Sequence, residues 1–389
     1  MSSVCSIFAQ LLRLFPRAEF QQSVKEHNAE RHARGFTCWG QFVAMLFCQL
    51  AHANSLREIC QGLAASEGKL KHLGVEHAPI RSTLAYSNQH RPWKLYETVF
   101  NRLLSRVEGE MVGTRKKFRF KNRLLSTDST SIELCAAVYD WALYKRAKGA
   151  VKLHVVLDHN GYLPCFVHIT NGKVHDVTMG RTLRFAPGTI VAMDKGYVDY
   201  AWWKEMCDGG VYFVTRLKQD LKYKIIQENA IPENSKIRGD HLIEIEPTPQ
   251  RPFTLVLRVV TIWDEEKQEE MAFLTNHLKF AASTIAGIYK QRWQIELFFK
   301  ALKQLLRVKT FVGTSSNALH IQVWTALIAV LLLKYMQFRA SAGLSLSNLV
   351  ALLRQQLFVY RDLWQWLKEP FQAPPALAGI HDRQMALAF

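Results

Sequence analysis

Cysteine is scarce in the sequence and never paired at short spacing. The seven cysteines among 389 residues include no C-x-x-C pair and form no cluster with histidine. This excludes the common tetrahedral zinc sites and gives no sign of a disulfide framework. We therefore expect reduced, mostly buried thiols at the seven positions, which are Cys5, Cys38, Cys48, Cys60, Cys135, Cys165 and Cys207.

We expect neither a signal peptide nor a bilayer-spanning segment in this sequence. The first 20 residues have no basic segment followed by a long apolar run and a small-residue cleavage site. The most apolar segment, "IQVWTALIAVLLL", begins at Ile321 and is bounded by His320 and Lys334, whereas a spanning helix needs about 20 apolar residues. We predict a buried core helix in a cytoplasmic protein that makes no membrane contact.

Acidic residues are outnumbered by basic ones. The chain has 50 Lys and Arg against 33 Asp and Glu, a formal net charge of +17. This balance favours a polyanionic partner, of which nucleic acid is the commonest and an anionic membrane surface is the rival. The hydrophobic content of 49%, with 22 Phe and 10 Trp, excludes a disordered chain and predicts a folded one with a sizeable core.

The first 110 residues have the periodicity of several short helices. The segments 38–53, 56–65 and 90–107 each carry an apolar stripe, and Asn54 with Ser55 is suited to cap the second of them. The basic, polar segment 77–91 between them is expected to be a connector. Short helices with a basic connector are compatible with a helix-turn-helix-like DNA reader, although most small helical domains have other roles.

Segments rich in β-forming residues follow from about residue 112. A basic run leads into a short apolar strand that is expected to end at Asp128, and two strands then flank Asn160-Gly161, a strong hairpin signal. The next apolar run stops at Asp194. From about 211 to 276 several further strands are expected, forming a small sheet inserted into the host domain.

The segment "IYKQRWQIELFFKALKQLL", residues 288–306, is predicted to be one amphipathic helix with an unusual charged stripe. At about 100° per residue, six charged or polar side chains fall on one narrow face beside a broader apolar arc. A single acid fixed among cations suits a metal ligand flanked by phosphate-binding groups. The alternative is a solvated, lysine-rich surface. The stripe consists of Tyr289, Arg292, Glu296, Lys300, Lys303 and Arg307.

Three acids therefore stand where a sheet and a packed helix can bring them together: Asp128, Asp194 and Glu296. Carboxylates in this arrangement suit two divalent ions about 3.5–4 Å apart. Hard oxygen ligands without a Cys/His cluster favour Mg²⁺ or Mn²⁺ over Zn²⁺. Each acid alone is weak support, because an aspartate at a strand end is more often a turn or cap residue.

Other polar and aromatic residues near these segments have simpler interpretations. Trp263, which ends a strand of the expected inserted sheet, is either an aromatic that stacks on an unpaired base or a core or surface residue. The remaining acids and histidines are taken as structural or solvated; they are Glu133, Asp158, Asp199, His154 and His175.

The spacing of Tyr289, Arg292, Glu296 and Lys303 reproduces the pattern Y-x2-R-x3-E-x6-K. In this the sequence resembles the insertion-sequence-four (IS-four) family of bacterial DDE transposases. The stretches "STDST" around Asp128 and "AMDKGY" around Asp194 resemble the two aspartate motifs of that family. The interval of 102 residues between Asp194 and Glu296 resembles the β-rich insertion that precedes its glutamate helix. The resemblance covers about residues 115–310.

The resemblance implies a ribonuclease H-like catalytic core. Asp128, Asp194 and Glu296 would be the catalytic acids and would coordinate two Mg²⁺ ions, for which Mn²⁺ can substitute. Tyr289, Arg292 and Lys303 would hold phosphates of the transposon end. The helix stripe adds Lys300 and Arg307 as further expected phosphate contacts, and Trp263 remains a candidate DNA contact.

The implied function is a DNA transposase that cuts the ends of an insertion sequence and transfers the strands into target DNA by cut-and-paste. Its partners would be double-stranded DNA, both terminal inverted repeats and target, with a homodimer in the DNA complex. It would work in the bacterial cytoplasm at the nucleoid. Two alternatives remain open: a non-catalytic, sequence-specific DNA-binding protein derived from a transposase, and a structure-specific nuclease with the same core.

The expected fold class is α/β, with a ribonuclease H-like core interrupted by a β-rich insertion and flanked by helical regions. The predicted domains are a helical, DNA-binding N-terminal domain (1–112), the first part of the core (113–210), the insertion (211–279), the continued core with the Glu296 helix (280–340), and a helical C-terminal region with a Pro-containing tail (341–389).

Overall fold

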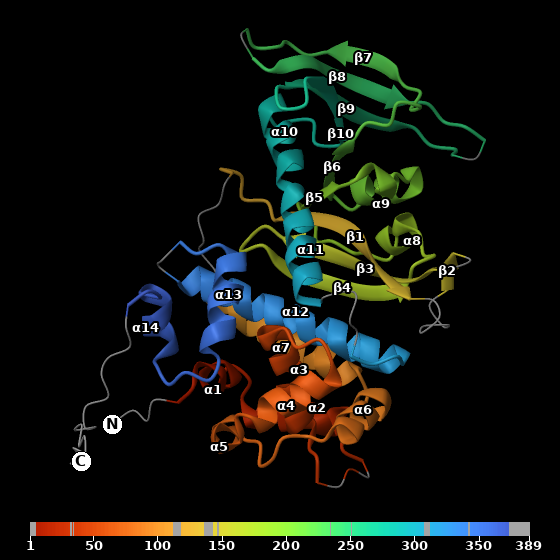
Figure 1. Ribbon diagram of the computed structural model, residues 1–389. Helices are drawn as coiled ribbons and strands as arrows, with labels where there is room; N and C mark the ends of the chain where they lie inside the picture. Colours follow the sequence, from red (N-terminus) through yellow and green to blue (C-terminus); the bar gives the residue numbers. More distant parts are fainter. Residues whose placement is uncertain are drawn as a thin grey trace, which may run out of the picture.

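The structure is a computed structural model, and its centre is one large mixed sheet with helices on both faces (Figure 1). The fold class is therefore α/β, as predicted. The described residues are 5–372 except 32, 34, 112–117, 136–142, 146–147, 234, 250, 307–311 and 341–342. The predicted Pro-containing tail lies largely outside them.

The chain begins with a helical part, continues through the strands of the sheet, and ends with a second helical part. The helices are α1 (Ile7–Leu12), α2 (Arg17–Glu26), α3 (Cys38–Ala51), α4 (Leu56–Ala64), α5 (Glu67–Leu70), α6 (Arg81–His90), α7 (Lys94–Met111), α8 (Asp176–Gly180), α9 (Tyr200–Asp208), α10 (Ala282–Gln291), α11 (Trp293–Leu306), α12 (Ser316–Arg339), α13 (Leu346–Gln356) and α14 (Leu363–Lys368). The strands are β1 (Leu124–Cys135), β2 (Leu143–Lys145), β3 (Lys148–Asp158), β4 (Leu163–Asn171), β5 (Ile190–Met193), β6 (Tyr212–Arg216), β7 (Lys224–Glu228), β8 (Ile237–Ile245), β9 (Leu255–Asp264) and β10 (Glu269–Thr275).

Among the described residues the sheet has ten strands, in the order β2-β3-β1-β5-β6-β10-β9-β8-β7, and β4 pairs with β3. Strands β1, β5 and β6 run parallel to one another, whereas β3 is antiparallel to both β1 and β4. Beyond β6 every pairing is antiparallel. The parallel centre therefore lies between two antiparallel flanks.

Alternation along the strands divides the two faces of the sheet. Leu124, Ile190 and Val214 pack with α10, while their neighbours in sequence, such as Val191 and Phe213, pack with α9 on the opposite face. Figure 1 shows α10 and α11 following one another along the sheet, with α8 and α9 on its other side. Any polar side chain that shares the phase of Ile190 thus points toward the α10–α11 face.

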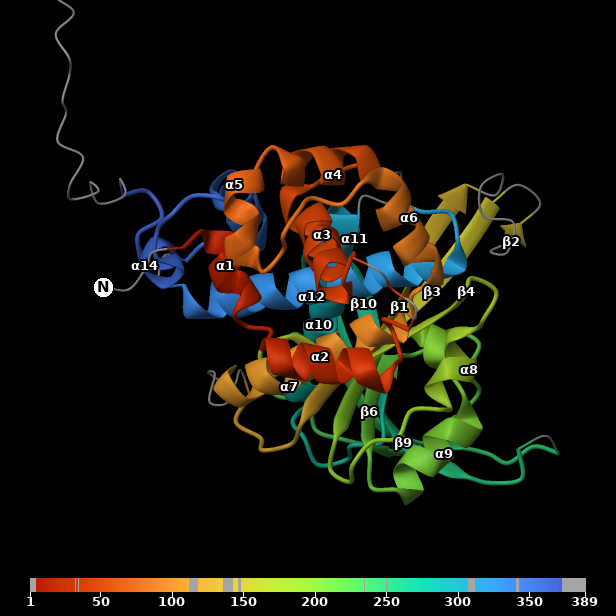
Figure 2. The ribbon, with the colours of Figure 1, turned by 90° about the horizontal axis from the view of Figure 1, so that it is seen from below.

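Helix α12 joins the helical part of the molecule to the sheet. It contacts α3, α6, α7, α11 and β4, and Figure 2 shows the N-terminal helices gathered around it. By length and composition alone it resembles a membrane span, but 83% of its apolar window is buried inside the protein. The predicted core helix at Ile321 is confirmed.

Several local predictions are also confirmed. The β3–β4 hairpin turns at Asn160-Gly161, where Gly161 takes a φ of +90° that disfavours a side chain. Ser55 caps α4 by accepting a hydrogen bond from the amide of Glu58 at 3.2 Å. The six cysteines whose side chains are described are free.

Two predicted boundaries were wrong. Strand β1 does not end at Asp128 but runs to Cys135, because its antiparallel pairing with β3 continues after its parallel pairing with β5 stops at Thr127. The segment 77–91 is not a connector, since residues 81–90 form α6.

Two larger elements also differ from expectation. The helix predicted over 288–306 is divided at Arg292, which lies between α10 and α11. The strands from 211 onward do not form a separate sheet: β6 pairs with β5, and β10, β9, β8 and β7 extend the same sheet. Strands β7 to β10, called the arm below, are therefore part of the same hydrogen-bonded sheet as the central strands.

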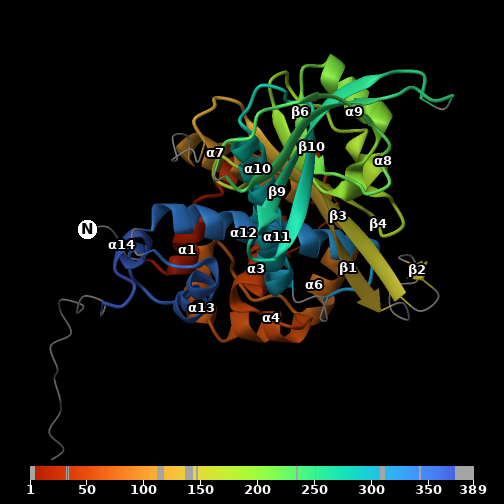
Figure 3. The same cartoon turned by 90° about the horizontal axis from the view of Figure 1, so that it is seen from above.

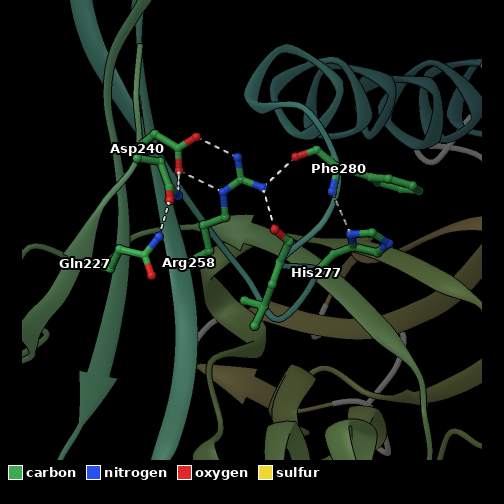
Figure 4. Close-up of polar contacts among 7 residues, drawn as sticks. Gln227, Asp240, Arg258, His277 and Phe280 are labelled. Atoms are coloured by element: carbon green, nitrogen blue, oxygen red, sulfur yellow. Dashed lines mark hydrogen bonds and ion pairs between the residues drawn. The ribbon is translucent and has the colours of Figure 1, made fainter.

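A buried ion pair connects this arm to the start of α10 (Figure 4). Arg258 donates to both carboxylate oxygens of Asp240, at 2.7 and 2.6 Å, and to the carbonyl oxygens of Leu278 and Phe280, at 3.1 and 2.5 Å. The two charged side chains are only 7% and 6% exposed. Burial opposes the charge of Asp240, but hydrogen bonds from Arg258 and Asn229 outweigh it and lower its pKa. Arg258 thereby fixes the loop from which α10 begins.

Candidate active site

Two aspartates lie side by side where the parallel strands β1 and β5 part. Thr127 and Met193 are the last paired residues of these strands, so Asp128 and Asp194 occupy the next position on each. Both share the phase of Ile190, and their side chains point toward the face that carries α10 and α11. Asp194 also caps the short turn that follows it, accepting from the amide of Gly196 at 3.4 Å.

Arg292 brings the glutamate to the same place. One terminal nitrogen of its guanidinium lies 3.0 Å from Asp128 Oδ2, and the other lies 2.6 Å from Glu296 Oε1. Since Glu296 is one helical turn beyond Arg292, the junction of α10 and α11 sets both side chains over β1. The guanidinium also lies 5.5 Å from the centre of the Tyr289 ring. An arginine thus holds together two of the three acids.

The pKa of Asp128 is affected by the charges of Asp194 and Glu296, so the three acids lie close together. Burial raises the pKa of Asp128 to about 6 from an ordinary 3.8; Arg292 and the amide of Ser129 oppose this, while the charges of Asp194 and Glu296 add to it. Burial also opposes the charge of Arg292, but Tyr289, Asp128 and Glu296 outweigh it and raise its pKa. The site therefore holds excess negative charge that a cation would relieve.

An open cavity of about 600 Å³ lies over two of these acids, Asp128 and Glu296. Asp128 and Glu296 line it together with Lys300 and Lys303 from the following turns of α11. Both lysines are exposed, and neither forms an ion pair with another described residue. Three residues of the predicted stripe therefore line the same cavity: Glu296, Lys300 and Lys303.

The carboxylate oxygens of the three acids are suitable ligands for a divalent metal, but they are not arranged as a complete metal site. Among residues whose placement is described, no three His, Cys, Asp or Glu side chains are grouped as a metal site. The guanidinium of Arg292 lies between Asp128 and Glu296 and pairs with both. Hard carboxylate oxygens with excess negative charge remain the donor set that Mg²⁺ and Mn²⁺ prefer.

Comparison with protein families shows which family the chain belongs to. A family model described as "Transposase DDE domain" matches residues 119–332, more than half of the chain. The chain belongs to the DDE transposases. A second family model, described as a domain of unknown function (DUF4372), matches residues 4–76. The transposase domain thus covers the sheet, α10, α11 and most of α12, while the second family covers helices α1 to α5.

Curated relatives confirm the resemblance to the insertion-sequence-four family. A Sinorhizobium fredii protein named as a transposase is 29% identical, over 80% of this chain and 87% of its own. A Geobacillus stearothermophilus protein named as a transposase for insertion sequence element IS5377 is 30% identical, over 68% and 70%. The Escherichia coli transposase for insertion sequence element IS4 is 22% identical, over 40% and 36%. This transposase is therefore a polynucleotidyl transferase that depends on divalent metal ions.

A solved structure gives a weaker likeness. The piggyBac transposase synaptic complex with hairpin DNA aligns over 95% of this chain and 82% of that one, at 13% identity and a TM-score of 0.46. At that score the likeness does not by itself establish a shared fold.

The other predicted site residues have different surroundings. Tyr289 is buried against Phe273, with ring centres 4.8 Å apart, and burial raises its pKa. Trp263 is half-buried on β9 opposite Glu270, in the arm of the transposase. Arg307 lies outside the described residues. Direct DNA contacts by these three residues remain predictions.

One acid near the site was missed from the sequence. Asp176, at the start of α8, lies 2.9 Å from Lys152 Nζ and 3.5 Å from His154 Nδ1. A Cβ atom added to Gly196 would lie 3.8 Å from Asp194 Oδ2 and 3.9 Å from Asp176 Oδ2. No sequence spacing links Asp176 to the other acids, because β5 and its preceding loop separate them in the chain. It is a near neighbour of the candidate site.

The raised pKa of Asp128 predicts a pH-dependent cost to stability in the metal-free transposase. Between pH 3.8 and about 6 the folded state binds more protons than the unfolded state, so the free energy of unfolding falls as pH rises. We expect the stability of Asp128→Asn relative to the parent to be more favourable at pH 8 than at pH 5, by about 1 kcal/mol.

Urea denaturation in EDTA at the two pH values measures this effect. The exposed pair Lys204 and Asp208 supplies the control, since Asp208→Asn should change stability by no more than about 0.5 kcal/mol. An Asp128→Asn advantage at pH 5 equal to or larger than that at pH 8 would contradict the predicted sign.

Proposed function

We propose that this transposase cuts the terminal inverted repeats of an insertion sequence and joins the freed strands to target DNA at the site around Asp128, Asp194 and Glu296. The observation that carries the proposal is the grouping of these acids with Arg292 beside a cavity lined by Lys300 and Lys303. The acids supply oxygen ligands, and the lysines supply charge for phosphates.

The chemistry consists of two phosphoryl transfers at one site. In the first, a water oxygen bonds to phosphorus at the element end, and the bond from phosphorus to the 3′ oxygen breaks, leaving a 3′-hydroxyl and a 5′-phosphate. In the second, that 3′-hydroxyl bonds to a target phosphorus, and the target's own 3′ oxygen leaves. Bound Mg²⁺, as two ions, would activate the attacking oxygen and stabilise the leaving one.

The residues of the chain position these reactants. Arg292 keeps Asp128 and Glu296 close together as anions before the metal is bound. Lys300 and Lys303 hold the scissile strand against the cavity by contact with its phosphates. No protein nucleophile is required, because positioning and charge stabilisation carry the rate.

We also infer that the core is ribonuclease H-like. Supporting this, three antiparallel strands, β4, β3 and β1, are followed in the sheet by β5 and β6 parallel to β1. Because two element ends must be joined together, the active assembly would be a homodimer on double-stranded DNA. Its place would be the bacterial cytoplasm, at the nucleoid.

A labelled duplex carrying the element end tests the function. In Mg²⁺ the protein is expected to nick the strand at the repeat boundary and, with target DNA added, to yield joined product. A protein that shifts the duplex without cutting it would be a non-catalytic DNA-binding protein. A protein that cuts but never joins a supplied 3′-hydroxyl end would be a nuclease.

The two lysines give a separate prediction about affinity. The double substitution Lys300→Ala and Lys303→Ala should reduce the slope of log K against log salt for end binding by about 2, since each lost phosphate contact removes about 0.9. Binding is measured in Ca²⁺ at several salt concentrations. Lys25→Ala, an exposed lysine on α2, is the control. An unchanged slope in the double variant would make the two lysines surface charges only.

A further inference from the structure

Helix α6 presents an unusual polar face to solvent. Its exposed residues are Arg81, Ser82, Tyr86, Gln89 and His90, which share one side of the helix, while Leu84, Ser87 and Asn88 are buried on the other. Tyr86 is 65% exposed, and its ring stacks on His90 at 4.1 Å. Ile80, just before the helix, is 67% exposed. The face is rich in hydrogen-bonding groups and contains no acid.

The opposite face of α6 is fixed by polar contacts rather than by a broad apolar stripe. Asn88 is buried and accepts a hydrogen bond from Gln41 on α3 at 2.8 Å. Asn317, at the start of α12, donates to the carbonyl oxygens of Asn88 and Arg91 at 2.8 and 2.7 Å. Arg91 also bonds to Gln41 and to the carbonyl oxygen of Phe36. The exposed face is therefore held rigidly.

The charge around α6 suits DNA. Residues 77–96 contain no aspartate or glutamate. Across a groove of about 570 Å³ between α4 and α6, Arg57 faces Arg81, and Lys94 is exposed just after the helix. The major groove admits an α-helix, whose amide and hydroxyl side chains can form hydrogen bonds with base edges. Cations at the edges of α6 are placed to contact the phosphates on either side of the groove.

The position of α6 links it to the catalytic acids. Asn317 anchors α6 to the start of α12, and α12 packs against α11, whose lysines line the acidic cavity. In all three ribbon views α6 lies on the side of the molecule where β1 ends, away from α14 (Figures 1, 2 and 3). Helices α6 and α11 are therefore connected through α12.

We propose that α6 is the helix that reads the terminal repeat, entering its major groove while α11 holds the strand to be cut. This inference rests on the proposed function and names the surface that would select the DNA end. The Gln89 amide pairs with the edge of an adenine, the Tyr86–His90 stack contacts a neighbouring base, and Arg81 and Lys94 hold the flanking phosphates.

Selection from a pool of randomised duplexes tests this and does not require the sequence of the repeat. The full chain in Ca²⁺, which prevents cleavage, should enrich one motif. Gln89→Ala should lower the ratio of specific to non-specific affinity for that motif about tenfold. Arg81→Ala should weaken all duplexes alike and reduce the salt slope by about 1. Gln21→Ala and Arg13→Ala, exposed on α2 and at the end of α1, are the matched controls.

The failure of this inference can be told apart from the failure of the proposed function. If Gln89→Ala and Tyr86→Ala select the same motif with unchanged affinity, while their thermal unfolding matches the parent, α6 does not read DNA. A parent chain that selects no motif overturns the inference as well. If the parent selects a motif but does not cut it in Mg²⁺, the transposase chemistry fails and the reading role of α6 stands.

Discussion

Asp128→Asn, Asp194→Asn and Glu296→Gln are each expected to slow strand cleavage about a thousandfold while leaving affinity for the element end within about threefold. Each change keeps the shape of the side chain but removes one carboxylate charge from the group of three acids. Single-turnover cleavage of a labelled end in Mg²⁺ measures the rate, and binding in Ca²⁺ measures the affinity.

Matched substitutions separate a role in catalysis from a general loss of charge. Asp208→Asn removes an exposed carboxylate paired with Lys204 on α9 and should leave cleavage unchanged. If any of the three variants cuts at more than about a tenth of the parent rate, that acid does not belong to the catalytic set. Loss of end binding in all three would instead point to misfolding.

Arg258→Ala is expected to have the largest effect on stability, about 3–5 kcal/mol, because it leaves the carboxylate of Asp240 buried without its partner. It also frees the carbonyl oxygens of Leu278 and Phe280, which precede α10. We therefore expect cleavage activity to fall as well, since α10 and α11 set the positions of Arg292 and Glu296. Urea denaturation with a matched cleavage assay measures both effects.

The control for this prediction is Arg238→Ala, an exposed arginine on β8, which should change stability by no more than about 0.5 kcal/mol. Replacing both partners, Asp240→Leu with Arg258→Met, should recover most of the lost stability, because no charge is then buried. A loss below about 1 kcal/mol in Arg258→Ala would show that solvent reaches Asp240 despite its burial.

The local chemistry of the site could be predicted from sequence because helical geometry fixes it. Glu296, Lys300 and Lys303 lie on one face at any angle of the helix to the sheet, and the structure places all three around one cavity. The meeting of Asp128 with Asp194 required more. It depends on which strands pair and in which phase, and pairing across 66 residues of chain leaves no local pattern.

Helix α6 was missed because its buried face is polar. Periodicity analysis looks for apolar residues at helical spacing, but only Leu84 supplies one, and Ser87 and Asn88 fill the other inward positions. Asn88 is satisfied by Gln41, a residue 47 positions earlier. No local signal reports such a partner.

The extent of β1 was misjudged for a different reason. Ile132 and Leu134 are buried and alternate with exposed Ser131 and Glu133, so the period-two pattern of a strand was present beyond Asp128. No sequence pattern indicated that strands β7 to β10 continue the main sheet. Whether β10 pairs with β6 is decided by contacts between distant segments, and the composition of a strand does not reveal its neighbour.

Iron-directed cleavage of the protein backbone tests the shared metal site most directly. Fe²⁺ substituted for Mg²⁺, with ascorbate and peroxide, cuts the chain next to its ligands. We predict three cuts, close to Asp128, Asp194 and Glu296, all of which weaken together in Asp128→Asn and disappear in excess Mg²⁺. Cuts at other positions, or cuts near one acid that survive the loss of another, would contradict a metal site shared by the three.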